Sequence, residues 1–157
     1  MPEDQEIGEG FRMQAFAVAE AFLRIVRSAA QHYGDVDTAT VYLAVVTAGL
    51  AGAVRDPEVV RRYGGETPVP LVYHRPVSRR AIAESTGLAR ETARRRLARL
   101  VEQGRLTEDD RGGLRGRYNL LAEPENLAFA RELMLEFQRT AERLERLGPA
   151  PKPVEAP

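Results

Sequence analysis

Residues 78–106 read SRRAIAESTGLARETARRRLARLVEQGRL, a pattern that predicts two short helices joined by a turn. Ser78 is a favourable N-cap for the first helix, and Gly87 lies in the turn between the two. The second helix spans residues 89–103, and its apolar positions cluster within about 100° of arc. We expect this apolar face to pack on the rest of the domain. The expected contacts are those of Ala93, Leu97, Leu100 and Val101 with Ile82 and Leu88.

The opposite side of the second helix is charged. Glu91, Thr92, Arg95 and Arg99 face away from the apolar side, Arg94 lies on the flank, and Arg90 is in the first turn. This is the layout of a helix-turn-helix, whose second helix enters the major groove of DNA. Arginine donates two parallel hydrogen bonds to guanine, and glutamate accepts one from the cytosine amino group. We therefore expect base-reading side chains at the start of this helix, namely Arg90, Glu91, Arg94 and Arg95.

Other polar side chains of the motif suit the DNA backbone, where contacts fix register without reading sequence. The expected phosphate-binding residues are Ser78, Arg79, Arg80, Thr92 and Arg99. The distribution of charge agrees with this assignment. The formal net charge is zero, yet residues 75–117 carry 12 Arg against 6 acidic residues, a balance of +6 that the rest of the chain offsets. Such asymmetry indicates a nucleic-acid-facing module attached to a part that is not one.

A β-hairpin is predicted after the second helix. Residues 105–107 and 117–120 are the expected strands, and the glycine-rich segment 108–116 is the expected loop. Two helices followed by a hairpin with a basic tip form the pattern of a winged helix-turn-helix. On this expected wing, Arg111, Arg115 and Arg117 would touch phosphates or the adjacent minor groove.

Part of the motif resembles a known family. The residues that carry the resemblance are Ser78-Arg79, Ile82-Ala83, Gly87, Arg90-Glu91-Thr92, Arg95, Leu97, Leu100 and Gly104. They resemble the DNA-binding helices of the cyclic-AMP-receptor/Fnr family, which implies base-reading roles for Arg90, Glu91 and Arg95. The same stretch is also similar to GntR-type winged helices, which implies Arg90 and Arg94 as base readers and Arg80 as a phosphate contact. The two resemblances agree on Arg90 and differ on its partner.

The resemblance covers residues 76–120 and does not extend to the rest of the chain. The first family places a β-roll sensor before its DNA-binding helices, whereas residues 1–60 here have a helical pattern. GntR regulators place the DNA-binding domain first. Ala89 stands where a Ser or Thr cap usually precedes the recognition helix. The flanking helices give a layout similar to MarR-type regulators, which dimerise through their terminal helices.

Two amphipathic helices flank the motif. In the first, from residue 11 to about 32, the apolar seam is Phe11, Ala15, Val18, Phe22, Ile25 and Ala29. In the last, residues 124–147, the seam is Leu127, Ala130, Met134, Phe137, Ala141 and Leu144. Such seams are typical of a core or of a dimer contact. Because DNA readers of this size usually need two half-sites, we expect a homodimer formed by one or both helices.

The fold class expected is mainly α. A winged helix-turn-helix spans residues 37–121 with an inserted loop over 56–77, preceded by a core or dimerisation helix over 11–34 and followed by the helix over 124–147. Residues 11–148 make a single domain, between a flexible N-terminus over 1–10 and a disordered tail over 149–157. Asp37 is the expected N-cap of a helix over 38–54. In the inserted loop, residues 57–63 are expected to form one or two helical turns, and 71–73 or Val77 a very short strand.

Several classes of site find no support in the sequence. The chain has no Cys, which excludes disulfides and thiolate chemistry. His32 and His74 have no second His nearby, and no nucleophile elbow, triad spacing or glycine-rich phosphate loop is present. We expect no catalytic residues, no metal and no cofactor. The most apolar run, residues 41–54, has 14 residues, which is short for a bilayer span, so we expect a cytoplasmic protein without a membrane partner.

The sequence therefore predicts a sequence-specific double-stranded DNA-binding transcriptional regulator that acts as a homodimer. Two alternatives remain open at this point. One is a winged helix that docks another protein, and the other is a regulator that senses a small molecule in a pocket among the helices.

Overall fold

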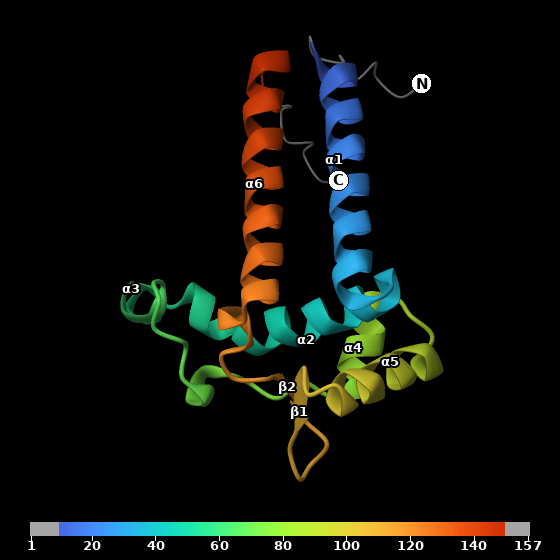
Figure 1. Ribbon diagram of the computed structural model, residues 1–157, viewed down its shortest axis with the longest axis vertical. Helices are drawn as coiled ribbons and strands as arrows, with labels where there is room; N and C mark the ends of the chain where they lie inside the picture. The colour runs from blue at the N-terminus through green and yellow to red at the C-terminus, as the bar shows by residue number, and fades with distance from the viewer. Residues whose placement is uncertain (1–9, 150–157) are drawn as a thin grey trace, which may run out of the picture. The chain divides into compact units, whose positions relative to one another are not determined.

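The computed structural model describes residues 10–149, which are mainly helical with one two-stranded antiparallel sheet (Figure 1). Internal contacts group these residues into two units, one of residues 29–127 and one of residues 10–28 with 128–149. Each unit is compact by itself, and the grouping of residues 11–148 into one domain stays a prediction. Except for Gly10 and Pro149, the expected flexible N-terminus and disordered tail lie outside the described residues.

The larger unit is built around α2 (Val36–Arg55). Asp35 caps this helix, since its carboxylate accepts a hydrogen bond of 2.8 Å from the backbone N–H of Thr38. The prediction that Asp37 is the cap was wrong. Aspartate is a favourable cap at either position, but Asp35 has the extended backbone of an N-cap, and Asp37 lies within the first helical turn. The side chains of Val41 and Val45 have no exposed surface, so α2 is the central helix of the unit.

The length of α2 bears on the membrane prediction. With 20 residues it is longer than the 14-residue apolar run of the sequence, and by length and composition alone it is long and apolar enough to cross a membrane. Core helices of soluble proteins pass the same test, and part of α2 is buried among the other elements of its unit. This helix alone is therefore weak evidence for or against a membrane-spanning segment.

The segment between α2 and the two-helix motif contains two short elements. The helix α3 (Pro57–Tyr63) follows a cap at Asp56, which confirms the helical turns expected there. Residues Leu71–Tyr73 form the 3-10 helix η1 rather than a strand. Val77, the other candidate for a short strand, makes a single antiparallel bridge with Leu114.

The helices α4 (Arg79–Thr86) and α5 (Arg90–Glu102) pack against α2 and against each other (Figure 1). Ser78 caps α4 as expected. Gly87 ends it at a φ of +69°, a left-handed conformation that glycine adopts without strain. The predicted contact face is confirmed, because Ile82, Leu97 and Leu100 are almost fully buried in one cluster with Val41 and Val45 of α2.

The sheet pairs β1 (Leu106–Glu108) with β2 (Leu114–Gly116), with Leu106 opposite Gly116. The second strand was predicted too late in the chain, at residues 117–120. The loop is shorter than expected because the Asp109 carboxylate accepts hydrogen bonds from the backbone N–H groups of Arg111 and Gly113. These bonds turn the chain within residues 109–113, and Leu114 begins the return strand. Residues 120–122 form the 3-10 helix η2 instead.

The smaller unit consists of residues 11–28 of α1 (Phe11–Tyr33) and residues 128–147 of α6 (Pro124–Leu147), which lie side by side (Figure 1). The buried side of α1 is formed by Gln14, Ala17 and Ala21. Gln14 donates hydrogen bonds to the carbonyls of Leu144, Gly148 and Pro149 at the end of α6. Small residues and one amide therefore fill this contact.

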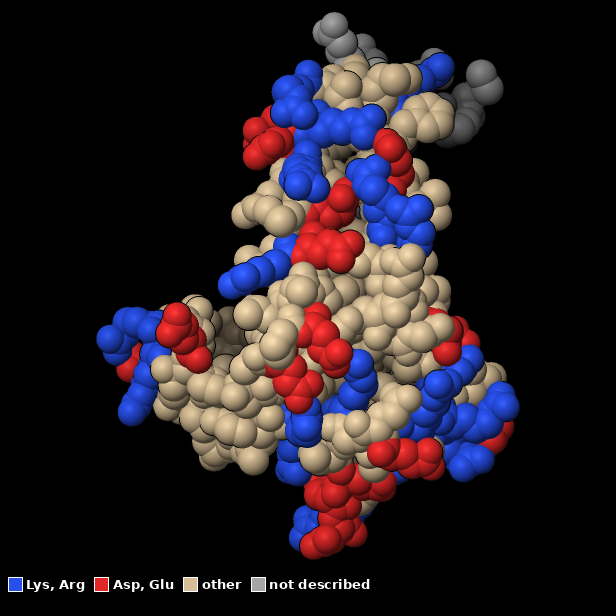
Figure 2. All heavy atoms as spheres, viewed as in Figure 1, with Lys and Arg blue, Asp and Glu red and all other residues tan. Residues whose placement is uncertain are grey.

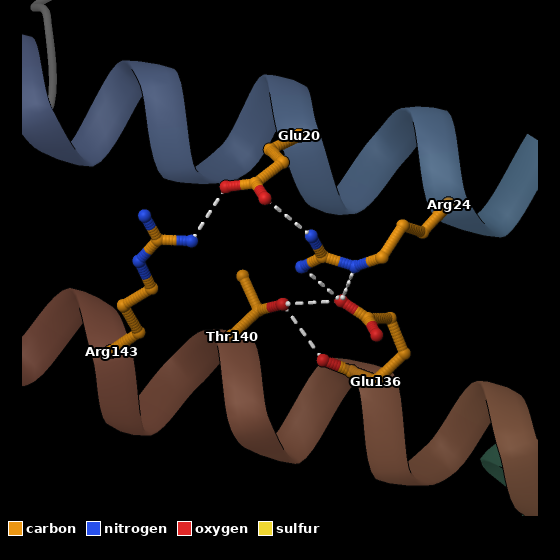
Figure 3. A network of polar contacts seen from close by, with 5 residues as sticks. All are labelled: Glu20, Arg24, Glu136, Thr140 and Arg143. Atoms are coloured by element: carbon orange, nitrogen blue, oxygen red, sulfur yellow. Dashed lines mark hydrogen bonds and ion pairs between the residues drawn. The ribbon is translucent and has the colours of Figure 1, made fainter.

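Four charged residues connect the two helices of the smaller unit (Figure 3). Arg24 donates two hydrogen bonds to one oxygen of Glu136, at 2.7 and 3.0 Å, and pairs with Glu20 at 2.9 Å. Glu20 in turn accepts a hydrogen bond from Arg143. The hydroxyl of Thr140 donates to the backbone carbonyl of Glu136. This network pairs the charged groups on one side of the contact between α1 and α6. The apolar seams of the two helices take no part in it.

The predicted seam of α1 is only partly covered within one chain. Ala29 is buried in the larger unit, but Phe11, Val18 and Phe22 are exposed by 42%, 48% and 64%. On α6, Met134 and Phe137 are each exposed by 62%. The face of α1 that packs within the smaller unit is thus the neighbouring one, which carries Gln14, Ala17 and Ala21.

Candidate nucleic-acid interface

Helix α5 is held from one side by apolar packing and at its middle by an ion pair. Ala93, Leu97 and Leu100 are buried beneath it. Arg96 lies 2.9 Å from the Asp35 carboxylate, the same group that caps α2. The start of α5 is therefore fixed relative to α2, and its opposite side is free of contacts with other elements of the described chain.

The expected base-reading residues lie on this free side. Side-chain exposure is 62% for Glu91, 61% for Arg94 and 68% for Arg95, and Arg90 is exposed in the first turn. Glu91 accepts hydrogen bonds of 2.7 and 2.8 Å from Arg94, and Arg95 lies 4.0 Å from the same carboxylate. The hydrogen bond from Arg94 lowers the pKa of Glu91, so this carboxylate is ionised at neutral pH and only accepts hydrogen bonds.

The expected phosphate-binding residues differ in how free they are. Arg99 is exposed and Thr92 half-buried on α5, and within the described residues neither Arg90 nor Arg99 forms an ion pair. Arg80 pairs with Glu84 at 2.7 Å on the surface of α4. The hydroxyl of Ser78 already accepts a hydrogen bond from Ala81 as the cap of α4. Exposed pairs of this kind contribute little energy and exchange readily for other partners.

Arg79 is more firmly engaged than the sequence indicated. Its guanidinium donates to both carboxylate oxygens of Glu108 at 2.6 Å each, and a further bond of 3.3 Å reaches the carbonyl of Gly112. Two of its nitrogens are thus directed at the hairpin. The hydrogen bonds of Arg79 are therefore made to the β1–β2 hairpin.

The hairpin carries less free positive charge than expected. Arg115 lies on β2, donates to the carbonyl of His74 and approaches Asp109 at 3.4 Å. Arg117 follows β2 and is hydrogen-bonded to Glu123. Of the three expected wing arginines, only Arg111 is in the loop itself, next to Asp110. Figure 2 shows acidic side chains gathered around the hairpin, whereas basic ones predominate over α5. The expectation of a basic tip was wrong.

Two arginines of structural importance were not singled out from the sequence. Arg96 joins α5 to the cap of α2. Arg105 lies over the ring of Tyr33, 5.3 Å from its centroid, and contacts Glu125 at 3.6 Å. The position of Arg96 on the helical wheel, between the apolar and the exposed side, is the one signal that would have distinguished it.

Within the described residues, no group of three or more His, Asp or Glu side chains is arranged to hold a metal ion. Comparisons with protein-family models, with curated proteins and with solved structures gave no significant match to this chain.

Proposed function

We propose that this protein is a sequence-specific double-stranded DNA-binding transcriptional regulator with a winged helix-turn-helix fold. In this proposal α4 and α5 are the two helices of the motif, α5 enters the major groove, and the β1–β2 hairpin is the wing. The protein acts in the cytoplasm and needs no cofactor. In this proposal its activity is binding and not catalysis.

One observation carries the proposal. Three consecutive turns of α5 divide sharply into a buried apolar side, with Ala93, Leu97 and Leu100, and an exposed side of guanidinium and carboxylate groups. Charged side chains that are only solvated do not require a helix that is held rigidly by its buried face. A fixed helix with Arg90, Glu91 and Arg95 near its start is what readout of base edges requires.

Engagement of DNA would rearrange the ion pairs of α5. In the free chain Glu91 forms an ion pair with Arg94 at 2.7 Å and lies farther from Arg95, at 4.0 Å. An adenine or cytosine amino group would take the place of one of these donors on Glu91, and the released arginine would turn to guanine or to a phosphate. Since such surface pairs are weak, this exchange costs little.

The apolar surface of the smaller unit supports the homodimer. Because α1 packs on α6 through Gln14, Ala17 and Ala21, large side chains on the neighbouring face have no partner within the unit, and a bundle of four helices would cover them. An open groove of about 570 Å³, lined by Phe11, Ala15, Val18 and Phe22, runs along this face. A second copy of the chain presents the same apolar face, which makes the contact self-complementary in the manner of a two-fold dimer.

The test begins with selection of binding sites from random double-stranded DNA by the full chain. Gel-shift titrations on the selected site and on its point variants follow. We expect Arg95→Ala to relax base preference at one position per half-site, with a loss of about 1–3 kcal/mol of discrimination. The control is Arg62→Ala on α3, which should leave the preference unchanged. Equal losses on every DNA variant for Arg95→Ala would contradict a reading role.

A salt series separates DNA binding from protein docking. Neutralisation of phosphates releases counterions, so the affinity for DNA must fall steeply and linearly with the logarithm of the salt concentration. A chain that selects no sequence and shows no such fall is not a DNA-binding regulator.

A further inference from the structure

A cavity of about 160 Å³ opens within the larger unit, beside the hairpin rather than at the exposed side of α5. One wall is α2, where Tyr42, Val45 and Val46 contribute apolar surface. The facing walls are residues 68–75 and the chain from Arg115 to Leu121. Acidic side chains are absent from its lining, although acidic residues are common elsewhere on this unit.

Backbone contacts fix the walls of this cavity. The N–H of Arg75 donates to the carbonyl of Gly49 on α2 at 3.0 Å. A Cβ added at Gly49 would lie 3.1 Å from the carbonyl oxygen of Arg75, and one added at Gly116 would lie 3.2 Å from Val46. Both glycines thus permit approaches that a larger residue would push apart. The cavity is what remains between segments tied together at their backbones.

The charge at the cavity is positive and incompletely balanced. Arg115 and Arg117 have acidic partners outside it, Asp109 and Glu123. The guanidinium of Arg75 lies over Gly52 of α2 and has no ion pair or side-chain hydrogen bond with any described residue. A cleft with apolar walls and one sign of charge focuses its field on an entering ion. The complementary ligand is an anion whose remaining surface is apolar.

We propose that this cavity binds a small organic monoanion, a single carboxylate on an apolar body. The size follows from the volume, since an apolar cavity of about 150 Å³ accommodates a benzene molecule. The apolar body would lie against Val45, Val46 and Tyr42, and the carboxylate would accept hydrogen bonds from Arg75 at the mouth. The site itself is independent of the proposed function.

A consequence for regulation rests on the proposed DNA-binding function. The cavity is lined by Gly116 of β2, and Arg115 of the same strand is tied to the carbonyl of His74 at its edge. A ligand between α2 and β2 contacts both the framework of the motif and its wing. The ligand would change the affinity for DNA only if it binds the DNA-free and the DNA-bound arrangements of the wing with different affinities. The factor by which the DNA affinity changes is the ratio of those two ligand affinities.

Isothermal titration of the full chain with cyclohexanecarboxylate tests the site. The neutral cyclohexanecarboxamide has nearly the same shape, and acetate has the same charge without the body. We expect binding of the carboxylate, and affinities at least tenfold lower for the amide, for acetate and for the carboxylate with Arg75→Gln. The control Arg62→Gln, an exposed arginine on α3, should bind as the parent chain does. Equal binding of amide and carboxylate, or absence of binding by all three compounds, would overturn the proposal.

Two further measurements locate the ligand and separate the hypotheses. Amide shifts in NMR spectra should concentrate at Gly49, Arg75 and Gly116, and shifts confined to residues 10–28 and 128–149 would refute this site. Val46→Phe should abolish binding by filling the cavity, with circular dichroism as the check on folding and Arg75→Gln as the variant if it does not fold. A chain that binds the carboxylate but no DNA refutes the proposed function alone, and one that binds DNA but no carboxylate refutes this inference alone.

Discussion

Arg79, the first residue of α4, and Glu108, the last residue of β1, are joined by two parallel hydrogen bonds of 2.6 Å across 29 residues of sequence. The same guanidinium reaches the carbonyl of Gly112 in the loop of the hairpin. The hydrogen bond from Arg79 lowers the pKa of Glu108, so both groups are charged at neutral pH. An arginine that the sequence assigns to a phosphate thus holds the hairpin to the start of α4. We infer that it positions the hairpin.

Substitution of Glu108 distinguishes the two roles of Arg79. If Arg79 positions the hairpin, Glu108→Gln loosens it, and the backbone amide protons that Val77 and Leu114 donate to each other's carbonyls exchange faster with solvent. We also expect weaker DNA binding, even though the substitution removes a negative charge. The matched control is Glu84→Gln, which breaks the Arg80–Glu84 pair on the same helix without touching the hairpin. If Glu108→Gln instead binds DNA more tightly and its amide hydrogen exchange is unchanged, Arg79 is a phosphate contact and does not position the hairpin.

The N-terminus of α5 lacks a side-chain cap, because Ala89 occupies that position and its methyl side chain accepts no hydrogen bond. Ala89→Ser would place a hydroxyl where it accepts from the free backbone N–H groups there. We expect unfolding to become harder by about 1 kcal/mol, as measured by urea denaturation. Ala98→Ser in the middle of the same helix adds the same hydroxyl without capping and should destabilise slightly. Equal effects of the two substitutions would contradict the capping explanation.

Asp35 makes stability depend on pH in acid. Burial alone would raise the pKa of Asp35, but hydrogen bonds from Thr38 and the charge of Arg96 outweigh burial and hold it below its ordinary value. A carboxyl with a lowered pKa in the folded state stabilises the fold above its ordinary pKa near 4, and this contribution disappears as the pH falls through the lowered value. We expect thermal unfolding of the Asp35→Ala variant to depend less on pH below about pH 4 than that of the parent chain.

The control for this prediction is Asp37→Ala. Asp37 reaches the same Arg96, but only at 4.0 Å, and it does not cap α2. Loss of the Asp35 cap should cost about 0.5–2 kcal/mol at neutral pH, whereas loss of Asp37 should cost clearly less. If both substitutions change the pH profile alike, the Arg96 charge and not the cap dominates.

The periodicity of the sequence was sufficient to predict the helices and their buried faces. Leu97, Leu100 and Ile82 are buried where their spacing places them, because a helix with a continuous apolar stripe has one way to remove it from water. Spacing failed where local hydrogen bonds decide. The start of α2 at Asp35 and the tight turn at Asp109 depend on which of two neighbouring aspartates accepts a backbone N–H. The sequence alone does not show which aspartate of each pair accepts the bond.

The candidate site was predictable in part for a related reason. Exposure of Glu91 and Arg95 follows from the helical wheel, which is a property of one element. The partners of Arg79 and Arg96 lie on other elements, in β1 and before α2, and depend on how these pack. Of the arginines between residues 75 and 117, the ones tied across elements could not be separated from the free ones by composition.

The apolar side of the smaller unit makes a prediction about assembly. Phe22 on α1 and Phe137 on α6 are exposed by 64% and 62% within one chain. Their burial between two copies would remove large apolar areas from water, each worth about 1.5–3 kcal/mol. We expect the parent chain to sediment as a dimer, and Phe22→Glu or Phe137→Glu to sediment as a monomer in analytical ultracentrifugation at micromolar concentration. The monomer should also bind single half-sites at best, since a two-fold dimer engages both half-sites of an inverted repeat.

Val72→Glu, the same kind of change at a residue exposed by 84% in the larger unit, is the matched control and should remain dimeric. A parent chain that is monomeric at all concentrations, or a dimer that survives both phenylalanine substitutions, would show that this face serves another partner.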